Sequence, residues 1–222
     1  RPLFLYIFLF CWHFLNALFT VEAPQSLYIV EHGNNVTMEC TFPVHGKLEF
    51  RDLSVSWEKK DELKQVYELR KGEEDFKNQH RDFMGRIKLL KENLNLGQSL
   101  LHITDVKLRD AGVYRCVIVY GGGDYKTIRL KVKAPYRIIN QGVVSIGHNE
   151  WKLTCQSEGY PEAEVIWQNR NGEDLTDKAN TRFETGSDQL YRVTSTLTIK
   201  SGIDEIFYCI FWNKELQENT SA

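Results

Sequence analysis

Residues 110–126 read DAGVYRCVIVYGGGDYK, and this stretch contains the pattern that decides the fold. Tyr114 lies two residues before Cys116 and directly after an Asp-Ala-Gly turn. A tyrosine at this spacing is typical of the corner where a strand enters a β-sandwich whose two sheets are joined by a cysteine pair. Three glycines follow, between two runs rich in β-branched and aromatic residues. Taken alone, they could form the tip of a β-hairpin or a loop that cradles a phosphate.

Four of the five cysteines occur in two consecutive Cys…Trp…Cys units. That arrangement is the mark of immunoglobulin domains, in which a buried tryptophan packs on a disulfide between two sheets. The wider first unit leaves room for the extra strands of a variable-type domain, and the narrower second unit fits a constant-type domain. We therefore predict an all-β chain of two tandem immunoglobulin-like β-sandwiches, each with one disulfide. The units consist of Cys40, Trp57 and Cys116, and of Cys155, Trp167 and Cys209.

The N-terminal segment differs in kind from the rest of the chain. One Arg precedes the apolar run Leu3–Trp12, and small Ala17 ends the segment. This is typical of a secretory signal peptide, and the run is too short for a membrane span. Secretion places the remaining cysteines in an oxidising compartment, where they pair. The predicted organisation is a signal peptide at 1–17, a variable-type domain at 18–133 and a constant-type domain at 134–222, with its C-terminal strand truncated.

Composition and motifs exclude several functions. A formal net charge of −2 provides no overall attraction to nucleic acid. The glycine loop lacks the Lys-Ser/Thr of a nucleotide-binding loop, and no helix pattern follows it. The histidines show neither metal-ligand spacing nor a neighbouring nucleophile motif. We expect no enzymatic activity, cofactor, metal or small-molecule substrate, and interpret the glycines as a hairpin tip.

Alternation along three predicted strands defines one outward face. Cys116 must face the core, so Val117 and Val119 face outward, beside Tyr125 on the next strand. Exposed valines can reflect β-propensity alone. An apolar patch with a charged rim is also how a protein recognition surface is built. The expected rim consists of Glu58, Arg115, Asp124 and Lys126.

The stretches DVKLRDAGVYRC, YGGGDYK, CQSEGYPEAEVIW, VTSTL and EIFYC closely resemble, in this order, those of the programmed death ligands. These are T-cell co-inhibitory ligands of the immunoglobulin superfamily. The resemblance covers nearly the whole chain. It implies a type I plasma-membrane protein whose front sheet binds the programmed death receptor on T cells and inhibits their activation. It also implies a costimulatory immunoglobulin-superfamily protein on the same membrane as a further partner. Carried over by position, the receptor-binding residues are Ser54, Ser56, Glu58, Asp61, Arg115, Val117, Val119, Gly123, Asp124, Tyr125, Lys126 and Thr127.

The resemblance has departures at the centre of this face. Ser54 and Ser56 stand where the mammalian members have larger apolar and aromatic side chains. Val117, Val119 and Thr127 differ from those members as well. An alternative interpretation is an adhesion or costimulatory module that uses the same face for homophilic or other heterophilic binding.

Two sequons predict N-glycosylation, at Asn35 and Asn219. Asn35 precedes the strand that contains Cys40, so we expect its sugar to lie away from the proposed binding sheet.

Overall fold

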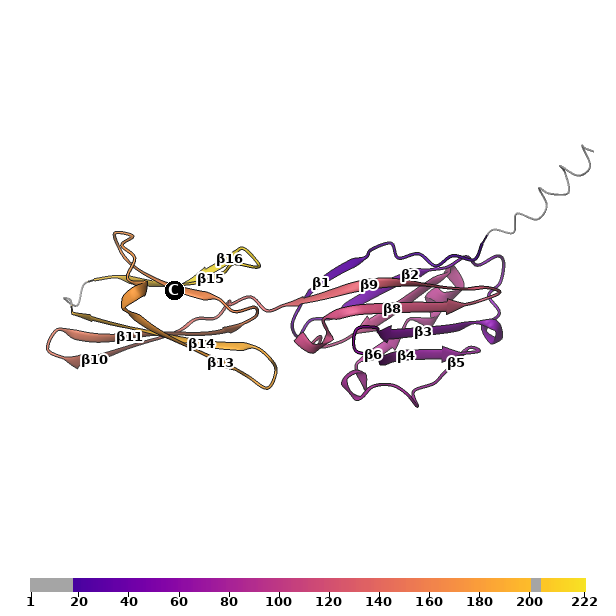
Figure 1. Ribbon diagram of the computed structural model, residues 1–222, viewed down its shortest axis with the longest axis horizontal. Coiled ribbons are helices and arrows are strands. Elements are labelled where there is room, and N and C mark those ends of the chain that lie inside the picture. The colour runs from indigo at the N-terminus through magenta and orange to yellow at the C-terminus, as the bar shows by residue number, and fades with distance from the viewer. Residues whose placement is uncertain (1–17, 201–204) are drawn as a thin grey trace, which may run out of the picture. The chain divides into compact units, whose positions relative to one another are not determined.

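The computed structural model describes residues 18–200 and 205–222 (Figure 1). The predicted signal peptide at 1–17 lies outside the described residues. Contacts divide the chain into two compact units. The predicted domain boundary after residue 133 stays a prediction. Among the described residues, the first unit holds 18–28, Asn35–Thr104 and Gly112–Leu130. The second holds Ile29–Asn34, Asp105–Ala111, 131–200 and 205–222.

The strands β1 to β9 form two sheets. The front sheet has the order β1-β9-β8-β3-β4-β5, and the back sheet has the order β2-β7-β6. Figure 1 shows β9, β8, β3 and β4 side by side in the front sheet. The strands are Leu27–Glu31, Val36–Thr41, Ser54–Lys59, Lys64–Arg70, Glu73–Glu74, Ile87–Leu89, Gln98–Ile103, Gly112–Val119 and Gly123–Lys133, and the short 3-10 helices η1 to η4 are Phe50–Asp52, Arg81–Phe83, Lys91–Leu96 and Leu108–Asp110.

The core between these sheets follows from period-two alternation. On β2, Val36, Met38 and Cys40 are buried while their neighbours are only half-buried. Each such side chain contributes about 1.5–3 kcal/mol when it leaves water. Trp57 on β3 is fully buried and donates its indole Nε1–H to Ser99 Oγ on β7, at 2.9 Å. This hydrogen bond joins the two sheets through the core.

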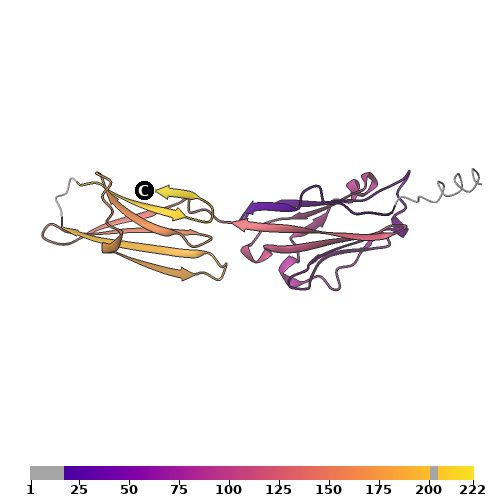
Figure 2. The same cartoon turned by 45° about the horizontal axis from the view of Figure 1, so that its top comes forward.

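The strands β10 to β16 form a second pair of sheets, β10-β11-β14-β13 and β12-β15-β16. Figure 2 shows these strands, coloured from salmon to yellow, in two layers. The disulfide between Cys155 and Cys209 connects the layers, and Trp167 donates its Nε1–H to Ser195 Oγ at 2.9 Å. The predicted all-β immunoglobulin architecture is confirmed. The strands are Asn140–Gly147, Glu150–Gly159, Glu164–Asn169, Ala179–Thr185, Tyr191–Lys200, Phe207–Asn213 and Glu218–Ser221, and η5 is Thr176–Lys178.

The first predicted disulfide stays a prediction. Cys40 and Cys116 are both buried and lie in contact, but no bond joins their sulfurs in the structure. Burial raises the pKa of the Cys116 thiol, and the hydrogen-bonded Cys40 thiol raises it further. The pattern therefore predicted correctly that these two cysteines meet in the core between the sheets.

Candidate functional site

The backbone register brings nine of the predicted binding residues together in three rows across β3, β8 and β9. Each row takes one outward side chain from each strand, because alternate residues project from the same side of a sheet. We call these nine residues the front face. The rows are Ser54, Val119 and Gly123; Ser56, Val117 and Tyr125; and Glu58, Arg115 and Thr127.

The centre of the front face is apolar and accessible. Val119 is 48% exposed and Tyr125 is 52% exposed, whereas Cys116 and Ile118, which alternate with the outward residues of β8, are buried. The predicted alternation on this strand is confirmed. Val117 is half-buried and lies opposite Tyr125 in the register. The three side chains form one contiguous apolar patch of the kind that marks protein-interaction surfaces.

A charged row borders this patch. Arg115 forms an ion pair with Glu58 on the neighbouring strand. Its guanidinium carbon also lies 5.6 Å from the centroid of the Tyr125 ring, within the range of a cation–π contact. The positive charge of Arg115 is therefore held between a carboxylate and an aromatic ring, and these contacts restrict the orientation of all three side chains.

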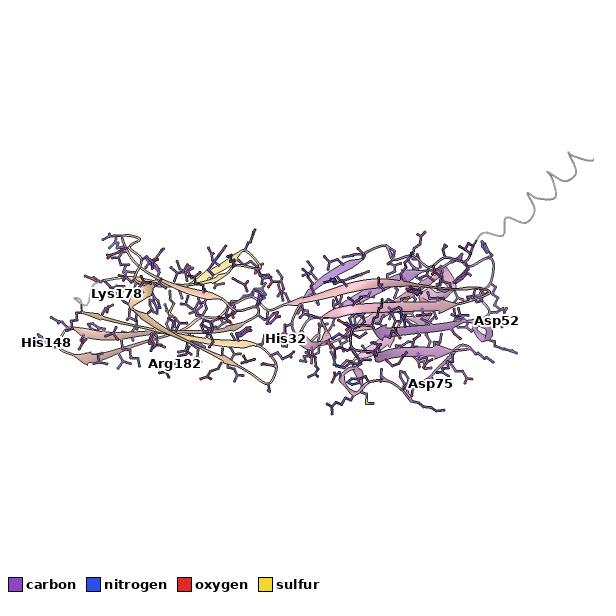
Figure 3. All side chains as sticks on the ribbon, viewed as in Figure 1. His32, Asp52, Asp75, His148, Lys178 and Arg182 are labelled. Atoms are coloured by element: carbon purple, nitrogen blue, oxygen red, sulfur yellow. A yellow bond between two sulfur atoms is a disulfide. The ribbon has the colours of Figure 1, made fainter. Side chains whose placement is uncertain are left out.

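The two serines form hydrogen bonds within the sheet. Ser56 Oγ accepts a hydrogen bond from Gln65 Nε2 at 2.9 Å, and Ser54 Oγ accepts one from the backbone N–H of Lys71 at 3.4 Å. The row that contains Ser54 lies at the end of the sheet where β3 begins, the end at which Figure 3 labels Asp52 of η1. The part of the front face formed by β3 is therefore small and polar.

Asp61 lies outside the three rows, in the turn between β3 and β4. Its Oδ2 accepts a hydrogen bond from the backbone N–H of Val113 on β8, at 3.3 Å. A side chain at Gly112 would collide with this carboxylate, because an added Cβ would lie 2.6 Å from Asp61 Oδ2. Asp61 thus lies beside the row of Glu58 and Arg115, as a fixed carboxylate at the border of the front face.

Asp124 and Lys126 differ from the expected rim. They pair with the core residues Ile118 and Cys116, so their side chains project from the side opposite to Tyr125. Asp124 Oδ2 accepts a hydrogen bond from the backbone N–H of Val21 at 2.8 Å. That bond, followed by one from the Tyr125 N–H, lowers the pKa of the Asp124 carboxyl. Asp124 therefore anchors the N-terminal segment, and a contact with a partner stays a prediction.

The glycine loop is the tip of a hairpin, as predicted. Gly121 has a φ of +66°, which favours glycine, and the Tyr120 N–H donates to the Gly122 carbonyl at 2.8 Å. At Gly122 the constraint is space and not φ, because an added Cβ would lie 2.6 Å from the Cβ of Phe19. The contact of Phe19 with this loop was missed from the sequence, since nothing in the pattern pairs residues so far apart.

The two sequons lie on accessible backbone. Asn35 is exposed directly before β2 of the back sheet, and Asn219 is exposed on β16. Because β2 belongs to the back sheet, a sugar on Asn35 would attach away from β3, β8 and β9. Its occupancy stays a prediction.

Among residues 18–200 and 205–222, no group of three or more acidic, histidine or cysteine side chains could hold a metal ion. In the same residues, no helix is long and apolar enough to cross a membrane.

Comparisons with known proteins agree with this architecture. The immunoglobulin V-set domain family matches residues 23–133, and the immunoglobulin constant domain of the butyrophilin subfamily 3 member A2-like type matches residues 142–221. The crystal structure of bovine butyrophilin has a TM-score of 0.71 at 22% identity, over 93% of this chain and 97% of that one. A structure of ICOS with ICOS-L has a TM-score of 0.74 at 20% identity, over 90% of this chain and 99% of that one. These likenesses show the fold.

Sequence relatives define the class more closely. The chain is 50% identical to mouse programmed cell death 1 ligand 1 over 217 residues, which cover 97% of this chain and 74% of that protein. It is 27% identical to the CD276 antigen homolog of Xenopus laevis, over 91% of this chain and 67% of that protein. The chain is an immune ligand of the immunoglobulin superfamily, with a variable-type and a constant-type region. Within that class it belongs to the family of programmed cell death 1 ligand 1.

Proposed function

We propose that this chain binds the programmed death receptor on T cells through its front face and thereby inhibits T-cell activation. The observation that carries the proposal is the apolar patch of Val117, Val119 and Tyr125, which is accessible on a sheet where solvated side chains are expected. Burial of such a patch at the centre of an interface, inside a polar border, is the arrangement found at binding hot spots. The 50% identity to mouse programmed cell death 1 ligand 1 supports the choice of receptor.

The electrostatics of the border support a protein partner over a small molecule. Glu58, Arg115 and Asp61 place both signs of charge beside the apolar patch. Such a pattern favours one orientation of an incoming surface and penalises surfaces with like charge at these positions. The proposed contact set is the front face with Asp61, together with Asp124 and Lys126 on the opposite side of the hairpin.

The small serines set the expected strength of binding. An interface of standard size buries about 1,600 Å² in total, and its affinity depends on the anchors at its centre. Ser54 and Ser56 supply little apolar area there, so Tyr125 and the two valines remain as anchors. We expect weak, transient binding of the monomer, strengthened by multivalent display on a membrane. A monomeric Kd of about a nanomolar or tighter would contradict this expectation.

Such a role requires display outside the cell. We propose that the chain enters the secretory pathway through the segment at 1–17 and reaches the plasma membrane as a type I protein with extracellular domains. Cell-surface labelling of the full-length protein in transfected cells tests this, and retention of the unprocessed chain in the cytosol would contradict it.

Surface plasmon resonance of the secreted ectodomain over the receptor of the same species tests the proposed function. We expect saturable binding that Tyr125→Ala and Val117→Lys abolish, since the first removes the aromatic anchor and the second places a charge in the apolar row. Leu96→Ala serves as the control, because Leu96 is exposed in η3, outside the front sheet. Absence of binding by a folded, monodisperse ectodomain would overturn the proposal. Concentration-dependent self-association in ultracentrifugation, lost in the same variants, would favour homophilic adhesion instead.

A further inference from the structure

The turn between β3 and β4 exposes one apolar side chain in a strained conformation. Leu63 has a φ of +54° and is 86% exposed. In this left-handed region the Cβ of a bulky residue crowds the backbone, so glycine or asparagine usually occupies it. Leu63 is the only apolar residue among the non-glycine positions of positive φ in the described parts of the chain; the others are Lys71, Asp105, Asn149, Gln189 and Gln217.

Ion pairs hold the residues on both sides of Leu63. Lys59 is buried, and its ammonium group pairs with Glu62, the residue before Leu63. Lys64, the residue after Leu63, pairs with Glu62 as well, and its Nζ lies 2.9 Å from Asp82 Oδ2. Both neighbours of Leu63 in the chain are therefore fixed by charged partners. A strained backbone persists where its surroundings determine it in this way.

Asp61 anchors the same turn to the front sheet. Its hydrogen bond from the Val113 N–H ties the turn to the start of β8. The register pairs Lys59 with Tyr114 and Glu58 with Arg115, so the turn continues the front face just beyond the row of Glu58 and Arg115. Leu63 thus lies two residues from the predicted contact residue Asp61, in the turn that follows the row of Glu58 and Arg115.

We propose that Leu63 is a further contact residue of the front face, an anchor that the braced turn presents to an apolar side chain of the receptor. The inference rests on the proposed function. The turn holds the leucine in place before binding, so the complex loses less side-chain and loop entropy than with a flexible turn. Without a partner, neither the strain nor the exposure of a leucine at this position stabilises the fold.

The test combines two substitutions at this position with receptor binding and thermal unfolding. Leu63→Gly removes the side chain and relieves the strain, and Leu63→Asn keeps a side chain that tolerates positive φ but is polar. We expect both variants to bind the receptor about five- to tenfold more weakly, mainly through faster dissociation, which is the effect of truncating a contributing interface residue. We expect their Tm to be at least that of the unsubstituted protein. Leu96→Ala is the matched control, because Leu96 is 74% exposed in η3 and its loss should leave the Kd unchanged.

The outcomes separate this inference from the proposed function. Binding that Tyr125→Ala abolishes, but that both Leu63 variants retain within twofold, would overturn the role of Leu63 alone. Absence of binding by the unsubstituted protein would overturn the proposed function and this inference together. An equal loss of affinity in Leu96→Ala would also overturn the inference, because the effect would then not be specific to the turn.

Discussion

The guanidinium carbon of Arg115 lies 5.6 Å from the centroid of the Tyr125 ring, and the same guanidinium forms an ion pair with Glu58. The most exposed aromatic side chain of the front face is therefore oriented by a charge that is itself held by a carboxylate on the next strand. In the proposed function, this arrangement would hold the Tyr125 ring in place before a partner binds.

Substitution of Arg115 should weaken receptor binding without unfolding the protein. Arg115→Ala removes the cation–π contact and leaves Glu58 without its ion-pair partner. We expect a loss of about tenfold in Kd, as for an interface residue worth about 1.4 kcal/mol. Tyr125→Phe keeps the ring and should bind within about threefold of the unsubstituted protein. Equal affinities for Arg115→Ala and the unsubstituted protein in surface plasmon resonance would contradict a role for this pair.

The buried indole groups should depend on their serine partners. Ser99→Ala and Ser195→Ala each leave a tryptophan N–H without its acceptor in the core, which costs about 1–3 kcal/mol. Chemical denaturation followed by tryptophan fluorescence measures this loss. Ser187→Ala changes an exposed serine and serves as the control. A loss no larger than that of the control would show that water or another group satisfies the indole.

The hairpin tip should not tolerate a side chain at Gly122. In Gly122→Ala the new methyl group meets Phe19, so the N-terminal segment must move and the hydrogen bond between Val21 and Asp124 weakens. We expect a lower Tm and faster amide exchange at Val21. In Gly142→Ala the nearest atom lies 3.8 Å away, so this variant should be near neutral. Unchanged exchange at Val21 would mean that Phe19 moves aside without cost.

The turn that contains Leu63 should lose stability in acid. The hydrogen bond from Lys59, and then that from Lys64, lowers the pKa of Glu62 below its ordinary value of 4.5. Between the Glu62 pKa of the folded protein and that of the unfolded chain, the unfolded chain binds more protons. The stability that Glu62 contributes is therefore complete above this range and is lost as pH falls through it.

Glu62→Gln measures this contribution. The variant should be less stable than the unsubstituted protein at pH 7, and the difference should shrink towards pH 3. Circular dichroism melts at both values provide the comparison, with Glu164→Gln, at an exposed position on β12, as the control. A difference that stays constant with pH would mean that Glu62 acts through packing and not through its charge.

The sequence by itself determined the fold and the centre of the candidate site. The two Cys…Trp…Cys units predicted the paired sheets, because a buried cysteine and tryptophan at those spacings fit few other arrangements. With Cys116 taken as inward, period-two alternation placed Val117 and Val119 outward. On the next strand, inward Ile128, Leu130 and Val132 left Tyr125 outward in the same way.

Only the tertiary structure decided which residues from distant strands meet. Chain folding brought Val21 and Phe19 to the glycine loop, where the Val21 N–H meets the Asp124 carboxylate. The ion pairs on either side of Leu63 also depend on neighbours in three dimensions. Alternation is a local property of each strand, whereas register, backbone strain and side-chain pairing arise only when the strands pack together.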